Sequence, residues 1–204
     1  MNTLALPPDL HALEKLRAEE LEEARSIQAE MLPAESLHAG PVTISHKTGT
    51  SPSEALATFN RRLLMRGMPR RHAAIQYAVF DPRSRDLRIA SAGIPGPFHL
   101  CADGCRPLEL SGIPPGLFPD TRYETLTVRL SPVDSVLFCT DGITDAFARD
   151  EEQFGVERLQ ELCSNKRHLS PAELLSKIFS AVEEFSWGRE QHDDMAAALF
   201  FYSG

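Results

Sequence analysis

The sequence lacks the features that would place the chain in a membrane or outside the cell. It contains no run of about 18 apolar residues, the length needed to cross a bilayer. Its first residues, MNTLALPPDL, have neither the basic start nor the apolar stretch of a secretory signal peptide. We therefore expect a cytoplasmic protein with no membrane among its partners.

Cysteine is also scarce, with 4 residues in a chain of 204. Without a signal peptide, so few thiols do not indicate a disulfide framework. Cys101 and Cys105 lie close in sequence, but structural zinc takes four ligands and this pair supplies only two. We interpret the thiols as buried or idle residues.

Positive charge is in short supply relative to negative charge. Lys and Arg number 21 against 29 Asp and Glu, which gives a formal net charge of −8. A nucleic-acid-binding surface favours a basic stripe, so we expect no nucleic acid among the partners. The length of 204 residues, with 42% apolar and 25% charged residues, is typical of one globular domain with a short appendage.

The appendage is predicted to be one long helix. Asp9 is a good N-cap and the next proline is Pro33, so residues 9–32 can form a continuous helix. Its apolar residues recur at an interval of eleven, which keeps one apolar stripe on a nearly straight helix. The stripe either pairs, most simply in a homodimer, or packs on its own domain. We therefore divide the chain into a linker or dimerisation helix, 1–33, and a domain, 34–204.

The domain shows an α+β pattern. Its first segment, 34–50, is abbreviated and reads as a loop with a short strand at 42–45. Two helices begin with the same signal, an N-cap serine, a proline and a glutamate, at Ser51 and Ser170. The first of these helices spans 52–65, and a third helix is predicted over 156–165. Strands are predicted over 73–80, 87–92, 98–101, 123–130, 136–139 and 195–202. Consecutive strands followed by paired helices favour a layered fold with antiparallel strands.

Two acidic clusters lie at the ends of predicted strands. Asp141 and Gly142 follow the strand at 136–139, and Asp193 and Asp194 precede the last strand. Carboxylates held at strand ends are suitable hard oxygen ligands for Mg²⁺ or Mn²⁺. Spacing alone leaves another interpretation open, because Asp-Gly is a common turn dipeptide and paired aspartates before a strand are typical of solvated loops.

The order of motifs in the second half favours the metal interpretation. The segments are Phe80-Asp81-Pro82, Ala90-Ser91-Ala92-Gly93, the GIPPGLF run from Gly112, the LFCTDGITDA run from Leu137, the FGVERL run from Phe154, and the QHDDM run from Gln191. In sequence and order they resemble the PPM-type (protein phosphatase 2C-like) serine/threonine phosphatases, in the bacterial branch named for sporulation stage II protein E and RsbU. The resemblance covers residues 73–202, and the helix at 9–32 is similar to the linker helix that precedes this domain.

This resemblance implies an α-β-β-α sandwich with two divalent ions, Mn²⁺ or Mg²⁺, and no catalytic side chain beyond the metal-bound water. Asp141 and Asp193 match metal ligands of the family, Asp194 matches a position with a less definite role, and Gly142 would serve the tight turn. The implied substrate is phosphoserine or phosphothreonine on a STAS-type anti-anti-sigma protein.

The chain departs from the family pattern before residue 80. The family has a Gly-Gly-Asp-x-x-Asp motif and an Asp-Val-Ser-Gly-His-Gly motif between the linker helix and the helix at 52–65, and neither is present. Residues 33–80 contain no aspartate, and their only acidic residues are Glu35 and Glu54. One ion or none is therefore expected here instead of two. The sandwich is expected to be incomplete, with two to three packed helices and apolar surface that a homodimer or the 9–32 helix would cover.

Three interpretations follow from these absences. The chain is a working phosphatase whose missing ligands come from a partner or a second chain, a phosphatase-like binding module without activity in the same pathway, or a truncated form of an active enzyme. On chemical grounds we expect weak or absent activity.

One basic patch lies after the helix at 52–65 and includes Arg70 and Arg71. It is either a docking surface for a phosphorylated or acidic partner or a solvated helix end. His192 stands beside Asp193, where it would assist a metal-bound water or simply occupy a turn.

Overall fold

The structure is a computed structural model that describes residues 36–39, 42–45, 51–65, 73–187, 189, 191 and 193–204. The helix predicted at 9–32, and with it the expected homodimer, lies outside these residues. The same is true of Arg70, Arg71 and His192. Among the described residues, no helix is long and apolar enough to span a bilayer.

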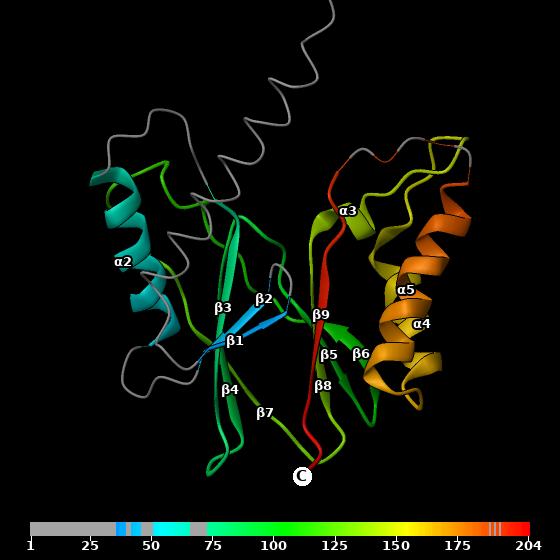
Figure 1. The fold of residues 1–204 in the computed structure, drawn as a ribbon, viewed down its shortest axis with the longest axis horizontal. Helices are drawn as coiled ribbons and strands as arrows, with labels where there is room; N and C mark the ends of the chain where they lie inside the picture. The colour runs from blue at the N-terminus through cyan, green and yellow to red at the C-terminus, as the bar shows by residue number, and fades with distance from the viewer. Residues whose placement is uncertain are drawn as a thin grey trace, which may run out of the picture.

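The described chain is layered as helix, sheet, sheet and helices (Figure 1). The outer helix α2 (Pro52–Met65) covers a three-stranded sheet of order β3-β4-β7, and the helices α4 (Gly155–Lys166) and α5 (Pro171–Phe185) cover a four-stranded sheet of order β6-β5-β8-β9. The strands of the first sheet are β3 (Ile75–Asp81), β4 (Asp86–Ala92) and β7 (Leu126–Arg129), and those of the second are β5 (Phe98–Cys101), β6 (Gly104–Pro107), β8 (Ser135–Cys139) and β9 (Ala197–Phe201). The α-β-β-α sandwich that the resemblance implies is confirmed.

Every ladder in the two sheets is antiparallel. The hairpin β3-β4 pairs Asp81 with Asp86 at the turn between the two strands. A separate two-stranded ladder joins β1 (Ser36–Ala39) to β2 (Val42–Ser45), which confirms the predicted strand at 42–45 and adds a partner for it.

Apolar residues fill three interfaces between the layers. Leu137, Ile143, Leu159 and Ile178 are fully buried between the second sheet and α4 and α5. Leu87, Ile89 and Val136 belong to the core between the sheets, and Leu56, Ala90, Ala92 and Tyr123 belong to the core beneath α2. Alternation along a strand explains this division, because Val136 and Leu137 point to opposite faces of β8.

Both predicted capping boxes are formed. At α5 the Ser170 amide donates to Glu173 Oε2 at 2.9 Å, and the Glu173 amide donates to Ser170 Oγ at 3.4 Å. At α2 the Ser51 amide donates to Glu54 Oε2 at 3.1 Å, and the Glu54 amide donates to Ser51 Oγ at 3.3 Å. Each pair satisfies two amides that a helix start leaves without an internal partner.

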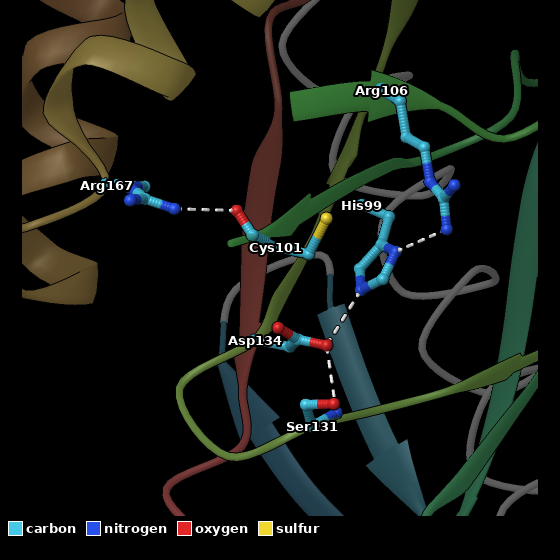
Figure 2. A network of polar contacts seen from close by, with 6 residues as sticks. All are labelled: His99, Cys101, Arg106, Ser131, Asp134 and Arg167. Carbon is cyan, nitrogen blue, oxygen red and sulfur yellow. Dashed lines mark hydrogen bonds and ion pairs between the residues drawn. The ribbon is translucent and has the colours of Figure 1, made fainter. Parts of the chain in front are cut away.

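A buried polar pair lies inside the second sheet, close to the turn that precedes β8 (Figure 2). His99 and Asp134 are 4% and 5% exposed, and His99 Nε2 lies 3.1 Å from Asp134 Oδ2. The same carboxylate oxygen accepts from the Ser131 amide at 2.9 Å, and Arg106 Nη2 lies 3.4 Å from His99 Nδ1. A guanidinium can only donate, so Nδ1 accepts and Nε2–H donates to Asp134. The pair therefore joins the β7–β8 turn to β5.

Candidate metal site

The two acidic clusters predicted from the sequence flank the same end of one ladder. β8 ends at Cys139, which pairs with Ala197 at the start of β9. Asp141 follows β8 as the first residue of the one-turn helix α3 (Asp141–Thr144), and Asp193 and Asp194 lie just before β9. The antiparallel pairing of these strands thus brings together backbone that is more than fifty residues apart in sequence, as the Thr140–Asp194 contact shows.

Thr140 joins the end of β8 to the segment before β9 by hydrogen bonds. Its Oγ1 donates to the carbonyl oxygen of Asp194 at 2.8 Å and accepts from the Ala196 amide at 2.9 Å. Its own amide donates to the carbonyl oxygen of Ala196 at 3.0 Å. The backbone before Asp141 and the backbone after Asp193 are therefore held against each other. Sequence reasoning treated Thr140 only as part of a motif and missed this function.

Gly142 allows the two segments to approach closely. A Cβ at this position would lie 2.6 Å from the carbonyl oxygen of Asp194 and 3.2 Å from that of Asp193. The sequence predicts Gly142 for a tight turn, but the structure places it within α3. The physical reason for glycine here is the missing side chain, which lets the backbone before β9 pack directly on α3.

The carboxylates differ in their surroundings. Asp141 is half-buried, whereas Asp193 and Asp194 are exposed. Asp193 Oδ1 accepts from the amide of Asp194 at 2.7 Å, which fixes one carboxylate oxygen on its own loop. The Asp145 amide donates to the carbonyl oxygen of Asp141 at 2.7 Å and closes the turn of α3. The exposed Asp145 carboxylate is not needed for that turn, because the amide alone makes this contact.

Cys139 precedes this site but offers it no thiolate. Burial, with smaller contributions from Cys105 and Asp141, raises the pKa of the Cys139 thiol to about 12. A thiol with this pKa stays protonated at neutral pH, and the thiolate is the form that binds metal. The remaining donors are oxygens, which suit Mg²⁺ or Mn²⁺ better than zinc.

The structure brings the backbone of the two acidic clusters together without gathering a metal-binding group of side chains from the described residues. No group of three or more His, Cys, Asp or Glu side chains that could hold a metal ion occurs in the part of the chain that the structure describes. Asp141, Asp193 and Asp194 are all described, so these three carboxylates do not gather into such a group. They do not fit the two-ion centre that the resemblance implies, in accord with the absence of aspartate from residues 33–80.

Comparison with known proteins decides the family. The family model described as Stage II sporulation protein E (SpoIIE) matches residues 25–200. The chain belongs to the SpoIIE family. The resemblance seen in the second half of the sequence is thereby confirmed. Protein IcfG of Synechocystis is 29% identical to the chain over 90 residues, which are 44% of this chain and 14% of that protein.

Solved structures similar to this SpoIIE-family chain include phosphatase domains. The SiaA-PP2C domain of Pseudomonas aeruginosa has a TM-score of 0.68 at 16% identity and covers 95% of this chain and 100% of its own. The RsbU and RsbW domains of Rv1364c from Mycobacterium tuberculosis have a TM-score of 0.62 at 23% identity. That match covers 76% of this chain and 43% of the other. The phosphatase domain of SpoIIE from Bacillus subtilis has a TM-score of 0.59 at 14% identity. That match covers 83% of this chain and 84% of the other. At these identities the likeness establishes the fold.

Proposed function

We propose that this SpoIIE-family chain is a cytoplasmic protein serine/threonine phosphatase domain of low intrinsic activity. Its proposed substrate is phosphoserine or phosphothreonine on a STAS-type anti-anti-sigma protein. The observation that supports this proposal most is the joining of Asp141 to Asp193 and Asp194 across the β8–β9 ladder through Thr140. The SpoIIE family match supports the class of reaction.

In this proposal Asp141 and Asp193 hold Mn²⁺ or Mg²⁺, and Asp194 contributes less. A bound divalent ion lowers the pKa of a water ligand and neutralises phosphoryl oxygens. Asp141 is half-buried on a short helix, so it supplies the more rigid carboxylate, whereas Asp193 is exposed on a loop. Thr140 positions both by fixing the backbone between them.

Low activity follows from the donor set. A hard divalent cation takes at least six oxygen ligands, and a site with few carboxylates binds it weakly. The described residues contain no group of three potential ligands. The same observation favours a second candidate, a phosphatase-like binding module that recognises its partner without hydrolysing the phosphate.

Hydrolysis tests the proposal. The purified chain is expected to hydrolyse p-nitrophenyl phosphate and a phosphoserine STAS protein slowly, only with Mn²⁺ or Mg²⁺, and Asp141→Asn is expected to abolish both reactions. Asp145→Asn is the matched control, because this carboxylate is exposed and lies four residues further along. Activity that survives Asp141→Asn, or that survives removal of metal by a chelator, contradicts the proposal.

Calorimetry separates the two candidates. The phosphatase is expected to bind Mn²⁺ at millimolar concentration or below, with one ion per chain, and to lose this binding in Asp141→Asn. A chain that binds the phosphoprotein but neither Mn²⁺ nor Mg²⁺ is the binding module.

The proposal also includes a homodimer through residues 9–32. Light scattering on the full chain is expected to give twice the monomer mass, and Leu21→Glu on the apolar stripe is expected to yield monomers. Glu22→Lys, on the charged side of the same segment, is the control.

A further inference from the structure

The loop that precedes β7 exposes an unusual amount of apolar side chain beside α2. Ile113 is 45% exposed, Leu117 46% and Phe118 59%. Met65, the last residue of α2, is 77% exposed. Single exposed apolar residues are normal on a protein surface, but several on adjoining segments indicate a binding surface.

The backbone of this loop is held by a buried side chain. Asn60 on α2 is 1% exposed. Its Oδ1 accepts from the Gly116 amide at 2.8 Å, and its Nδ2 donates to the Phe118 carbonyl oxygen at 2.8 Å. Figure 1 shows the result, a loop lying alongside the end of α2. Leu117 lies between the two bonded residues, so Asn60 fixes the backbone on both sides of it.

Further hydrogen bonds fix the other side of the loop. The Gly93 amide donates to the Gly112 carbonyl oxygen at 2.8 Å, and the Ala73 amide donates to the Pro115 carbonyl oxygen at 3.2 Å. The loop thus has a defined conformation while its large side chains remain in solvent. A surface that is ordered before binding loses less conformational entropy when a partner arrives.

The charges around the apolar side chains are positive. Arg61 and Arg62 are exposed on α2, one turn before Met65, and neither has an ion-pair partner among the described residues. The next charged residues along the loop, Asp120 and Arg122, are exposed and opposite in sign. This positive rim stands out in a chain whose formal net charge is −8.

The rim identifies the kind of partner. In a symmetric pair, this surface on one copy would meet the same surface on the other, so one interface would contain the arginines of both copies. Like charges brought together across an interface oppose association, whereas an acidic partner would be attracted. The charges therefore favour a different, acidic protein over a second copy of the chain.

We propose that Ile113, Leu117, Phe118 and Met65, flanked by Arg61 and Arg62, form the docking surface for the phosphoprotein substrate. We call these six residues the α2–loop surface. The partner would present apolar side chains surrounded by acidic residues. The surface lies at the same end of the sandwich as α3, which begins with Asp141 (Figure 1). This inference rests on the proposed function, because it names the surface by which the same site receives its substrate.

Binding measurements test the inference without requiring turnover. A phosphoserine-bearing STAS-domain protein is immobilised, and the full chain is titrated over it by biolayer interferometry. Leu117→Ser/Phe118→Ser is expected to weaken binding at least tenfold. Val133→Ser is the matched control, since Val133 is 73% exposed and lies on the β7–β8 turn. Circular dichroism checks that each variant is folded.

The outcomes separate docking from catalysis. Weaker binding in Leu117→Ser/Phe118→Ser supports docking at the α2–loop surface, whether or not the wild type hydrolyses phosphate. A wild type without hydrolysis contradicts only the phosphatase proposal. Unchanged binding in that variant overturns the docking inference, as does a wild type that fails to bind the phosphoprotein while still hydrolysing p-nitrophenyl phosphate. Self-association or binding to phosphatidylglycerol vesicles that depends on Leu117 and Phe118, with no phosphoprotein binding, also overturns it.

Charge reversal gives an independent readout. Arg61→Glu/Arg62→Glu is expected to lower the association rate at least fivefold at low salt, with a smaller effect in 0.5 M NaCl, because surface charges act mainly on encounter. Arg83→Glu, on the exposed β3–β4 turn, is the control. Association rates that are equal for the two variants contradict the acidic partner.

Discussion

Thr140 and Asp194 are joined by a hydrogen bond of 2.8 Å from the threonine hydroxyl to the aspartate carbonyl oxygen. The same hydroxyl accepts from the Ala196 amide at 2.9 Å. One side chain therefore satisfies a donor and an acceptor of the segment that leads into β9. Because Asp141 and Asp193 both lie outside the strands, we expect the position of Asp193 relative to Asp141 to depend on this contact.

Replacing the hydroxyl tests this dependence. Thr140→Val keeps the shape but leaves the Asp194 carbonyl and the Ala196 amide without this partner, so we expect Mn²⁺ affinity to fall about tenfold, the lower end of the effect of residues that orient ligands. The free energy of unfolding should fall by about 1–3 kcal/mol. Calorimetry and urea denaturation measure the two effects.

Thr140→Ser is expected to restore Mn²⁺ binding, because it retains the hydroxyl. Thr127→Val is the control, since this threonine is exposed on β7. Equal Mn²⁺ affinity in Thr140→Val and the wild type would show that Thr140 does not position the carboxylates.

Gly142 gives a second test at the same place. In an ordinary helix, replacing glycine by alanine stabilises the helix by about 1 kcal/mol. Here the added Cβ would lie 2.6 Å from the Asp194 carbonyl oxygen, so we expect Gly142→Ala to lower the free energy of unfolding by about 1–3 kcal/mol instead. Urea denaturation measures the sign, and a stabilised variant would show that the close approach is not needed.

Local signals predicted the helices well. The capping boxes at Ser51 and Ser170 depend on neighbours three residues away, so the sequence contains all the information that places α2 and α5. Strand β6 was missed because its GCRP sequence has no apolar alternation and depends on pairing with β5. Similarly, the strand predicted over 123–130 is confined to β7 (Leu126–Arg129), since only those residues find partners on β4.

The site could be predicted only in part. The positions of Asp141 and Asp193 at strand ends agree with the sequence pattern, and their assignment as metal ligands stays a prediction. That β8 and β9 are neighbours, and that Thr140 reaches Asp194, are long-range properties that no local pattern records. Asn60 is a similar case, because a polar residue within a helix gives no sign that it will be buried and will hold a loop from another part of the chain.

The buried pair of His99 and Asp134 is expected to matter for stability. Asp134→Ala leaves His99 Nε2–H and the Ser131 amide without their acceptor in a site that is almost inaccessible to water (Figure 2). We expect the free energy of unfolding to fall by about 3 kcal/mol. Asp134→Asn should cost less, because both hydrogen bonds go to Oδ2 and an amide oxygen in its place can accept them.

Urea denaturation of the two variants measures this difference. Asp120→Ala is the control, since Asp120 is exposed on the loop before β7. A free energy of unfolding for Asp134→Ala within 0.5 kcal/mol of the wild type, or one equal to that of Asp134→Asn, would contradict the structural importance of the pair.

The capping box of α5 predicts a dependence of stability on pH. The hydroxyl and amide of Ser170 donate to the Glu173 carboxylate and lower the pKa of Glu173 below its ordinary value of 4.5, with a smaller contribution from His168. A carboxyl group whose pKa is lower in the folded state stabilises the fold above its unfolded pKa, and this contribution disappears as pH falls through the folded pKa. Glu173→Gln should therefore be less stable than the wild type at pH 7, and the difference should shrink at pH 3.

Urea denaturation at both pH values measures this difference in the free energy of unfolding. Glu183→Gln, on an exposed part of α5, is the control. A difference that is the same at pH 7 and pH 3 would mean that the Glu173 charge does not stabilise the cap.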